Sequence, residues 1–272
     1  MAKTIRAQRV NHLNLVLPDF DTSVAHFRDL YGAEFLIDLP NAEFHACLIE
    51  IGRVIIEIFV PPAFLLWSRL GPHYLGIEYQ ADMDEVREVI AAHGMRIVRD
   101  IGVALHTHPA DGFGVAFEFY AGSFHDNEPP VLQKTVKPQA YWRDEHPLGI
   151  TGLKAYTLAV HDIEAASRFL QSFLGAAPAY EAPRPAIGAR AVGLQVADCV
   201  VELLAPVGEG PLIEHLKESG QGIRSIVFGT RDLDQARRGL EGRGVALAPG
   251  AAPDSFAVPT AANLGVLFEF SA

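Results

Sequence analysis

The sequence predicts an α+β fold built from four copies of a βαβββ module. Three observations predict it: a repeated pattern of one strand followed by one helix, an aspartate before each expected helix and a glycine after it, and one glutamate in the last strand of each copy. The copies follow one another as A, B, A′ and B′. We therefore expect two tandem domains with mixed sheets that curl, because strands twist and the helices cover only one face.

Modules A and A′ begin with matching segments, 12–35 and 155–178. Each segment starts with an alternating apolar strand and continues into a helix with apolar residues at helical spacing. An aspartate side chain caps the start of such a helix well, and a glycine ends it. The residues concerned are Asp19 and Asp162 at the starts, and Gly32 and Gly175 at the ends.

Modules B and B′ repeat this pattern at 75–97 and 226–247, where we expect Gly94 and Gly244 to close the helices. Three strand-like runs follow each helix, and the last strand of every module carries one glutamate. These glutamates are Glu57, Glu118, Glu202 and Glu269.

The predicted domains are 1–122 and 149–272, joined by a connection at 123–148 that is rich in proline and charge. The composition excludes several classes of function. The chain has 272 residues, of which 49% are hydrophobic, and a formal net charge of −11 without a Lys/Arg block, which argues against a nucleic-acid partner. The N-terminus has no signal-peptide core and no run reaches the length of a membrane span, so we expect a cytoplasmic protein without a membrane partner.

Strand alternation singles out the residues that can carry chemistry. His12 and Asn14 share one face of the first strand, opposite to the leucines that pack under the helix. Glu57 and Glu118 each stand inside an apolar strand, where a carboxylate needs a partner, a metal or a proton. Such a mixed nitrogen and oxygen site suits a divalent Mn, Fe, Co, Ni or Zn ion.

A second histidine appears at the same sequence separation as the first. His12 precedes Glu57 by 45 residues, and His73 precedes Glu118 by 45 residues. Modules A and B would then each offer one histidine and one glutamate, and the predicted ligands are His12, His73, Glu118 and Glu57.

The motif HxxxxxPD followed by FxxxYG resembles the vicinal-oxygen-chelate superfamily, which includes glyoxalases, bleomycin-resistance proteins and extradiol dioxygenases. THPADGFGVAFEF (107–119) and ELLAPVGEGPLIEHLKESGQGIRSIVF (202–228) resemble methylmalonyl-CoA epimerase in particular. The resemblance implies two glyoxalase-like domains. It makes His12 and Glu118 metal ligands and places Glu57 where glyoxalases have a ligand carboxylate. It also leaves a homodimer open, because cups of this type often complete themselves by pairing.

The fourth ligand position has two candidates. The family motif GIHHI uses its second histidine, where this sequence has Tyr74, with His73 one residue earlier. Alternation favours Tyr74, whereas a bulge would turn His73 into the cup. Glu78 shares the face of Tyr74 and His106 lies in LHTHP, so we expect Asn14, Tyr74, Glu78 and His106 to contact substrate.

The second half keeps Glu202 and Glu269 but has no histidine beside them. At the histidine positions stand Ala155 and either Ile223 or Ser225. We therefore expect modules A′ and B′ to have lost the metal ligands, and to serve a structural role or to close over the first site.

The resemblance implies a metal-dependent isomerase, epimerase or lyase that acts on a small carbonyl substrate through a metal-stabilised enolate, with Glu57 or Glu118 moving the proton. Two alternatives remain: an extradiol-type Fe(II) dioxygenase with His12, His73 and Glu118 as a facial triad, and a metal-free small-molecule binding protein. The enzymatic hypotheses require that His12 lie within about 5 Å of the Glu118 carboxylate, on the same side of the sheet.

Overall fold

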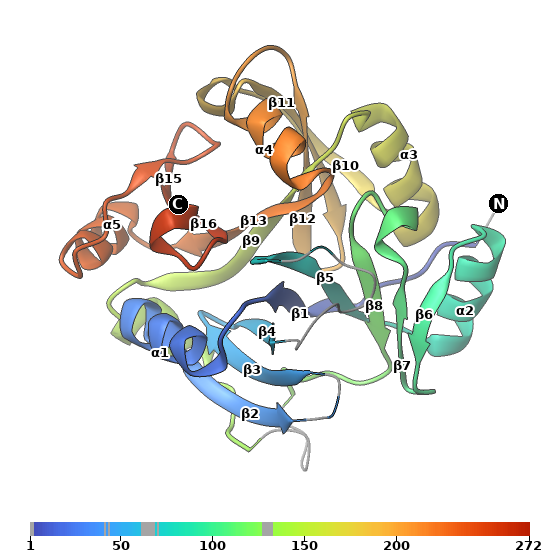
Figure 1. Cartoon of the computed structure of the whole chain (residues 1–272), viewed down its shortest axis with the longest axis horizontal. Coiled ribbons are helices and arrows are strands. Elements are labelled where there is room, and N and C mark those ends of the chain that lie inside the picture. The colour runs from blue at the N-terminus through green and yellow to red at the C-terminus, as the bar shows by residue number, and fades with distance from the viewer. Residues whose placement is uncertain (1–2, 41, 43, 61–68, 70, 127–132) are drawn as a thin grey trace. The chain divides into compact units, whose positions relative to one another are not determined.

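The computed structural model describes residues 3–40, 42, 44–60, 69, 71–126 and 133–272. All four predicted modules are present, each as a strand, a helix and three strands (Figure 1). Module A comprises β1 (Arg9–Val16), α1 (Phe20–Tyr31), β2 (Glu34–Pro40), β3 (His45–Ile51) and β4 (Val54–Val60). Module B comprises β5 (His73–Gln80), α2 (Met83–Ala92), β6 (Ile97–Asp100), β7 (Ala104–Thr107) and β8 (Ala116–Tyr120).

The second half repeats the order with one additional helix. Module A′ comprises β9 (Ile150–Ala159), α3 (Ile163–Leu174), β10 (Ala177–Arg184), β11 (Ala189–Val196) and β12 (Cys199–Pro206). The additional helix α4 (Pro211–Ser219) follows it. Module B′ comprises β13 (Gly222–Thr230), α5 (Leu233–Glu241), β14 (Ala248–Pro249), β15 (Ser255–Val258) and β16 (Leu267–Ser271). Short helical turns lie at η1 (Pro109–Asp111), η2 (Tyr141–Glu145), η3 (Pro185–Ile187) and η4 (Thr260–Ala262).

The strands form two mixed sheets of eight strands, in the orders β2-β3-β4-β1-β5-β8-β7-β6 and β10-β11-β12-β9-β13-β16-β15-β14. In every module the first strand pairs in parallel with the last, and the pairings among the last three strands are antiparallel. This arrangement confirms the predicted fold. It brings the first and last strands of each module side by side, so that residues far apart in the sequence become neighbours.

The four repeat helices begin at the predicted aspartates, whose side chains accept a hydrogen bond from a backbone N–H of the first turn. Gly32 and Gly175 end α1 and α3 in the left-handed conformation, with φ of 67° and 62°. Helices α2 and α5 end at caps one and two residues before the predicted Gly94 and Gly244. None of the helices in the described ranges combines the length and apolar character needed to cross a bilayer.

The chain packs into two compact units, and each unit takes strands from both halves of the sequence. The ranges are 1–11, 75–123 and 155–224 for the first unit, and 12–74, 124–154 and 225–272 for the second. The predicted boundaries near 122 and 149 separate the strands of the two sheets instead. As domain boundaries they stay a prediction.

The first unit has an aromatic core that joins module B to module A′. Phe173 of α3 packs against Phe117 and Phe119 of β8, with ring centroids 5.5 and 6.0 Å apart. The fully buried hydroxyls of Tyr79 and Tyr156 share a hydrogen bond of 2.8 Å, which satisfies two polar groups that burial would otherwise make costly.

The second unit joins module A to module B′ in the same way. Phe27 and Tyr31 of α1 pack against Phe268 of β16, at centroid separations of 5.6 and 5.2 Å. The hydroxyl of Tyr31 donates to the side-chain oxygen of Asn263 over 2.7 Å. Stripes of apolar side chains at helical spacing therefore meet strands from a distant part of the sequence.

Candidate metal centre

Strand β1 holds His12 and Asn14 on one face, as alternation predicts. The two side chains are buried, and His12 Nδ1 lies 2.6 Å from Asn14 Oδ1. An amide oxygen can only accept, so this contact assigns the proton to Nδ1 and the lone pair to Nε2. Asn14 therefore orients the imidazole so that its Nε2 acts as an acceptor or a ligand.

Glu57 lies beside this pair because β1 and β4 run in parallel, with Asn14 in register with Glu57. Its Oε2 is 3.6 Å from His12 Nε2, and both side chains are nearly inaccessible to solvent. The Glu57 carboxylate thus lies close enough to contact a metal ion or a substrate bound at His12 Nε2.

Module B contributes two glutamates and a second histidine. Glu78 of β5 is in register with Glu118 of β8, and His106 of β7 pairs with Glu118 from the other side. His106 Nε2 lies 2.9 Å from Glu118 Oε1, and all three side chains are buried. Buried carboxylates are costly unless they are paired or bind a cation, so this group is chemically significant.

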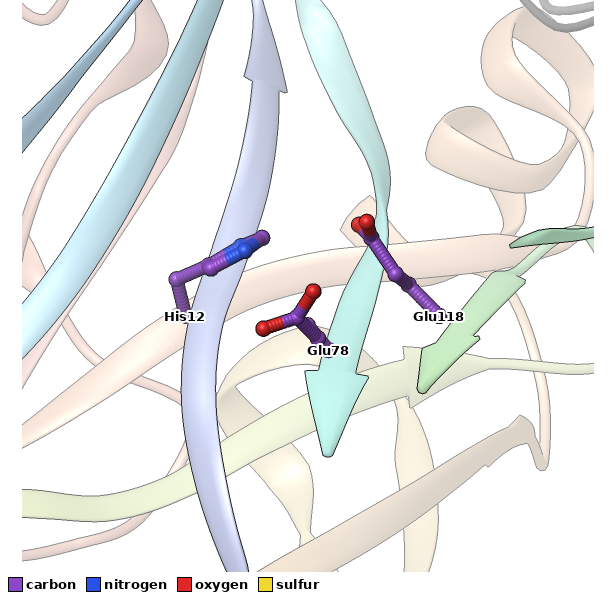
Figure 2. Close-up of side chains that lie close together, drawn as sticks. All are labelled: His12, Glu78 and Glu118. Carbon is purple, nitrogen blue, oxygen red and sulfur yellow. The ribbon is translucent and has the colours of Figure 1, made fainter. Parts of the chain in front are cut away.

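His12, Glu78 and Glu118 form a cluster on β1, β5 and β8, which are consecutive strands of the first sheet (Figure 2). One ligand atom from each residue lies within 4.8 Å of the others. His12 and Glu118 thus lie within the distance of about 5 Å that a shared metal ion requires, and their role as metal ligands stays a prediction. One imidazole nitrogen and two carboxylate oxygens are donors of the kind that hold a divalent cation.

The other predicted ligands lie outside this cluster. His73 Nδ1 is 2.7 Å from the carbonyl oxygen of Gly71, and burial lowers the pKa of His73 to about 4. Tyr74, the alternative at this position, donates its hydroxyl to Leu267 O over 2.6 Å and accepts from Ile226 N over 3.2 Å. The third member of the cluster is instead Glu78, which sequence reasoning assigned to substrate.

Strand register explains why a glutamate takes the place expected for a histidine. Glu57 and Glu118 are equivalent, and their parallel partners are Asn14 and Glu78. Two residues earlier on these strands stand His12 and Gly76, so Gly76 occupies the position equivalent to His12. A Cβ atom there would lie 1.9 Å from the carbonyl oxygen of Ala116, which leaves no room for a side chain.

The matching separation of 45 residues counts positions along the chain and ignores where the strands pair, and His73 does not take the position on β5 that His12 takes on β1. A sequence signal for Glu78 does exist. Gly76 and Glu78 are two residues apart on one face of β5, just as His12 and Asn14 are on β1.

In the second sheet, Glu202 is equivalent to Glu57 and forms hydrogen bonds with two neighbouring side chains. Arg184 donates from Nε to Glu202 over 3.0 Å and from Nη2 to its other oxygen, which also accepts from the hydroxyl of Tyr180. Glu202 is in register with Thr157, so Ala155 stands at the position of His12.

Glu269, the counterpart of Glu118, accepts from Ser225 Oγ over 2.7 Å and from the backbone N–H of Ala251 over 2.6 Å. Its parallel partner is Val227, so register selects Ser225 over Ile223 as the residue at the histidine position. Both glutamates of the second half have the hydrogen bonds of structural carboxylates.

Comparisons with known proteins identify similar sequences and folds. Residues 156–260 match the model of the Glyoxalase/Bleomycin resistance protein/Dioxygenase superfamily. A variant of 4-hydroxymandelate synthase from Streptomyces coelicolor aligns with a TM-score of 0.73 at 15% identity, covering 97% of this chain and 92% of that one. The Mn(II)-bound glyoxalase from Novosphingobium aromaticivorans aligns with a TM-score of 0.62 at 12% identity, covering 98% and 82%.

Methylmalonyl-CoA epimerase from Mycobacterium tuberculosis aligns over 45% of this chain and 89% of its own, at 26% identity and a TM-score of 0.43. The search of curated proteins gave no match. The family-model match and the two alignments that span nearly the whole chain confirm the resemblance to the vicinal-oxygen-chelate superfamily that the sequence motifs indicated.

Proposed function

We propose that this chain, whose fold is that of the vicinal-oxygen-chelate superfamily, is a divalent-metal-dependent isomerase, epimerase or lyase that acts on a small carbonyl compound. The observation that carries the proposal is the buried cluster of His12, Glu78 and Glu118, whose ligand atoms lie within 4.8 Å of one another. Three such groups gathered in one place are costly to bury without a cation that offsets the two carboxylate charges.

The donor set fits a metal ion in chemistry and in scale. Two ligand atoms that each bind one ion at about 2.1 Å lie about 3 to 4 Å apart, so the cluster needs to contract by only about an ångström. Two carboxylates and one imidazole favour Mn²⁺ or Fe²⁺ over ions that prefer thiolates. The glyoxalase of the same fold is Mn(II)-bound, which makes manganese the first ion to test.

Neighbouring side chains support the three ligands. Asn14 fixes the tautomer and the ring orientation of His12 through the 2.6 Å contact to Nδ1. His106 lies against Glu118 Oε1 at 2.9 Å and holds that carboxylate from the other side. Contacts of this kind orient metal ligands and raise metal affinity.

A bound divalent metal would polarise a substrate carbonyl oxygen and stabilise negative charge that develops there. The residues of the chain supply the rest. Glu57 Oε2 lies 3.6 Å from His12 Nε2, which places a carboxylate beside the ligand without making it a member of the cluster. Glu57 is therefore the base that accepts the proton from the carbon next to the carbonyl and returns it. The burial of Glu57 and His12 excludes water from this proton.

The donor set bears on the dioxygenase alternative. A facial triad for Fe(II) oxygenases requires two histidines and one carboxylate, whereas the cluster holds one histidine and two carboxylates. We therefore place the carbonyl chemistry first. Oxygen consumption by the Fe²⁺-loaded protein with catechols would favour the dioxygenase instead.

Metal content tests the first part of the proposal. The protein is dialysed against chelator, titrated with Mn²⁺ and freed of unbound ion, and bound manganese is measured by atomic spectroscopy. We expect about one ion per chain, and its loss in His12→Ala and Glu78→Gln. His73→Ala is the matched control, a buried histidine that should keep the ion. Retention of manganese by both cluster variants, or no binding by the wild-type chain, contradicts the proposal.

Proton exchange tests the second part. The loaded protein is incubated in D₂O with hemithioacetals, 2-substituted thioesters and 2-hydroxy ketones, and the loss of the α-proton signal is followed by NMR. Glu57→Gln should slow exchange by about 10² to 10⁴-fold while metal content stays unchanged. Exchange that proceeds at the wild-type rate in Glu57→Gln removes Glu57 from this role.

A further inference from the structure

The connection between the two halves of the sequence folds back onto the sheet face that carries His12 and Glu57. Its described residues Phe124 and Val136 join an apolar cluster with Leu36, Leu48 and Ile55. Leu48 is in register with Glu57, and Ile55 precedes Glu57 by two residues on the same face. The connection therefore packs directly beside the proposed base.

A buried carboxylate fixes the connection in this place. Glu50 of β3 accepts from the backbone N–H of Lys137 over 2.9 Å and from Trp142 Nε1 over 3.0 Å. The backbone N–H groups of Gln133 and Lys134 donate to Leu36 O over 3.0 and 3.1 Å. These hydrogen bonds tie the second part of the connection to β2 and β3.

The first part of the connection contacts the ligand histidine. The rings of Phe124 and His12 are 5.6 Å apart between centroids and tilted by 49°. Only 2% of His12 is exposed, whereas Phe124 is partly exposed. A molecule that approaches His12 from solvent on this side meets the Phe124 ring.

From this placement we infer that Phe124 is a specificity-determining wall of the site, which selects substrates with a flat or apolar group next to the metal-binding oxygens. The inference rests on the proposed function, because it assumes that His12 binds a metal. Aromatic rings gain from edge or offset contacts with flat groups, and the neighbouring Leu48 continues the apolar surface.

The test compares two bidentate oxygen chelators that differ in one substituent, acetohydroxamate and benzohydroxamate. Their affinities for the Mn²⁺-loaded protein are measured by calorimetry, and the ratio of the two dissociation constants is the readout. Because both probes bind the metal through the same atoms, the ratio reports the contact of the phenyl group. We expect Phe124→Ala to reduce the preference for benzohydroxamate by about tenfold relative to wild type.

Two further variants keep the test decisive. Phe124→Leu retains most of the apolar volume and should fold if Phe124→Ala does not, and we expect it to lose about threefold of the preference. Val136→Ala removes apolar volume from the same cluster without touching His12, so its chelator ratio should equal that of wild type. An unchanged ratio in both Phe124 variants, or an equal change in Val136→Ala, overturns the inference. If the wild-type chain does not bind Mn²⁺, the proposed function itself is contradicted.

Discussion

Gly76 shows how much one residue decides about this site. At the position equivalent to His12 the chain carries no side chain, because the carbonyl of Ala116 would lie 1.9 Å from a Cβ atom. Glu78, two residues further along the same strand, is the third member of the buried cluster with His12 and Glu118. The close approach of the two backbones at Gly76 leaves the carboxylate of Glu78 as the side chain that this strand contributes to the cluster.

We expect Gly76→Ala to destabilise the fold by about 2 to 3 kcal/mol, since the β5 and β8 backbones must separate to admit a methyl group. Urea unfolding measures the change. The control is Gly208→Ala, at a glycine with no atom within 4 Å of the added Cβ, which should change stability by less than about 0.5 kcal/mol. Similar losses in the two variants would argue against the close approach.

Asn14 offers a second prediction, since it holds His12 but is not itself in the cluster. Asn14→Ala should weaken Mn²⁺ binding by about 10 to 100-fold, because the imidazole loses the partner that fixes its tautomer. Competition with a fluorescent chelator measures the affinity. Asn11→Ala is the matched control: its amide, also buried on β1, donates to Gly122 O over 3.1 Å. An affinity loss of the same size in Asn11→Ala would show a general effect on β1.

The contact between β3 and the connection is expected to respond to pH through Glu50. Burial raises the pKa of Glu50 to about 7 from 4.5, more than the hydrogen bonds from Lys137 and Trp142 lower it. The folded chain therefore binds this proton more tightly than the unfolded chain. The contribution of Glu50 to stability is most favourable below about pH 4.5, declines as the pH rises to about 7, and is constant above that.

Glu50→Gln should remove this decline, since an amide does not ionise. Its NH₂ group cannot accept the second of the two hydrogen bonds, so the variant also carries a loss of stability that does not depend on pH. We expect the stability of wild type relative to the variant to fall by about 2 to 3 kcal/mol between pH 4.5 and pH 8. Unfolding in urea at a series of pH values measures the difference. Glu241→Gln, at an exposed glutamate of α5, should follow wild type at every pH. A Glu50→Gln curve parallel to that of wild type would contradict this account.

At the scale of the whole molecule, the two sheets have the same strand order but differ in how they use their glutamates. The first sheet gathers Glu78 and Glu118 with His12, whereas the second pairs Glu202 with Arg184 and Glu269 with Ser225. Equivalent positions in the two sheets thus hold the same residue type, and the neighbouring side chains differ. One metal per chain is the expected stoichiometry.

Arg184→Met tests this difference. It leaves the buried Glu202 carboxylate without its cation and should cost about 3 to 5 kcal/mol of stability, whereas Arg184→Met combined with Glu202→Met should recover most of that loss. Thermal or urea unfolding measures stability, and atomic spectroscopy measures manganese. Both variants should bind manganese like wild type if the second sheet holds no ion. Loss of manganese in the double variant would show that Glu202 acts as a ligand.

The sequence by itself determined the four modules, their order and the faces of their strands. These features are local: alternation places His12 and Asn14 together, and aspartates and glycines mark the ends of helices whatever the helices pack against. The two residues His12 and Glu118 could be predicted as site members for the same reason, because each stands out as polar within an apolar strand.

Only the tertiary structure decided the third member and the surroundings of the site. Which residue of β5 faces Glu118 depends on how β5 pairs with β8, and a helix and two strands lie between them in the sequence. A change of register would exchange one residue for another without any mark in the sequence. That Phe124 packs against His12, and that Arg184 neutralises Glu202, likewise follows from backbone paths that bring distant segments together. Local preferences act over a few residues, whereas these contacts arise from the packing of the folded chain.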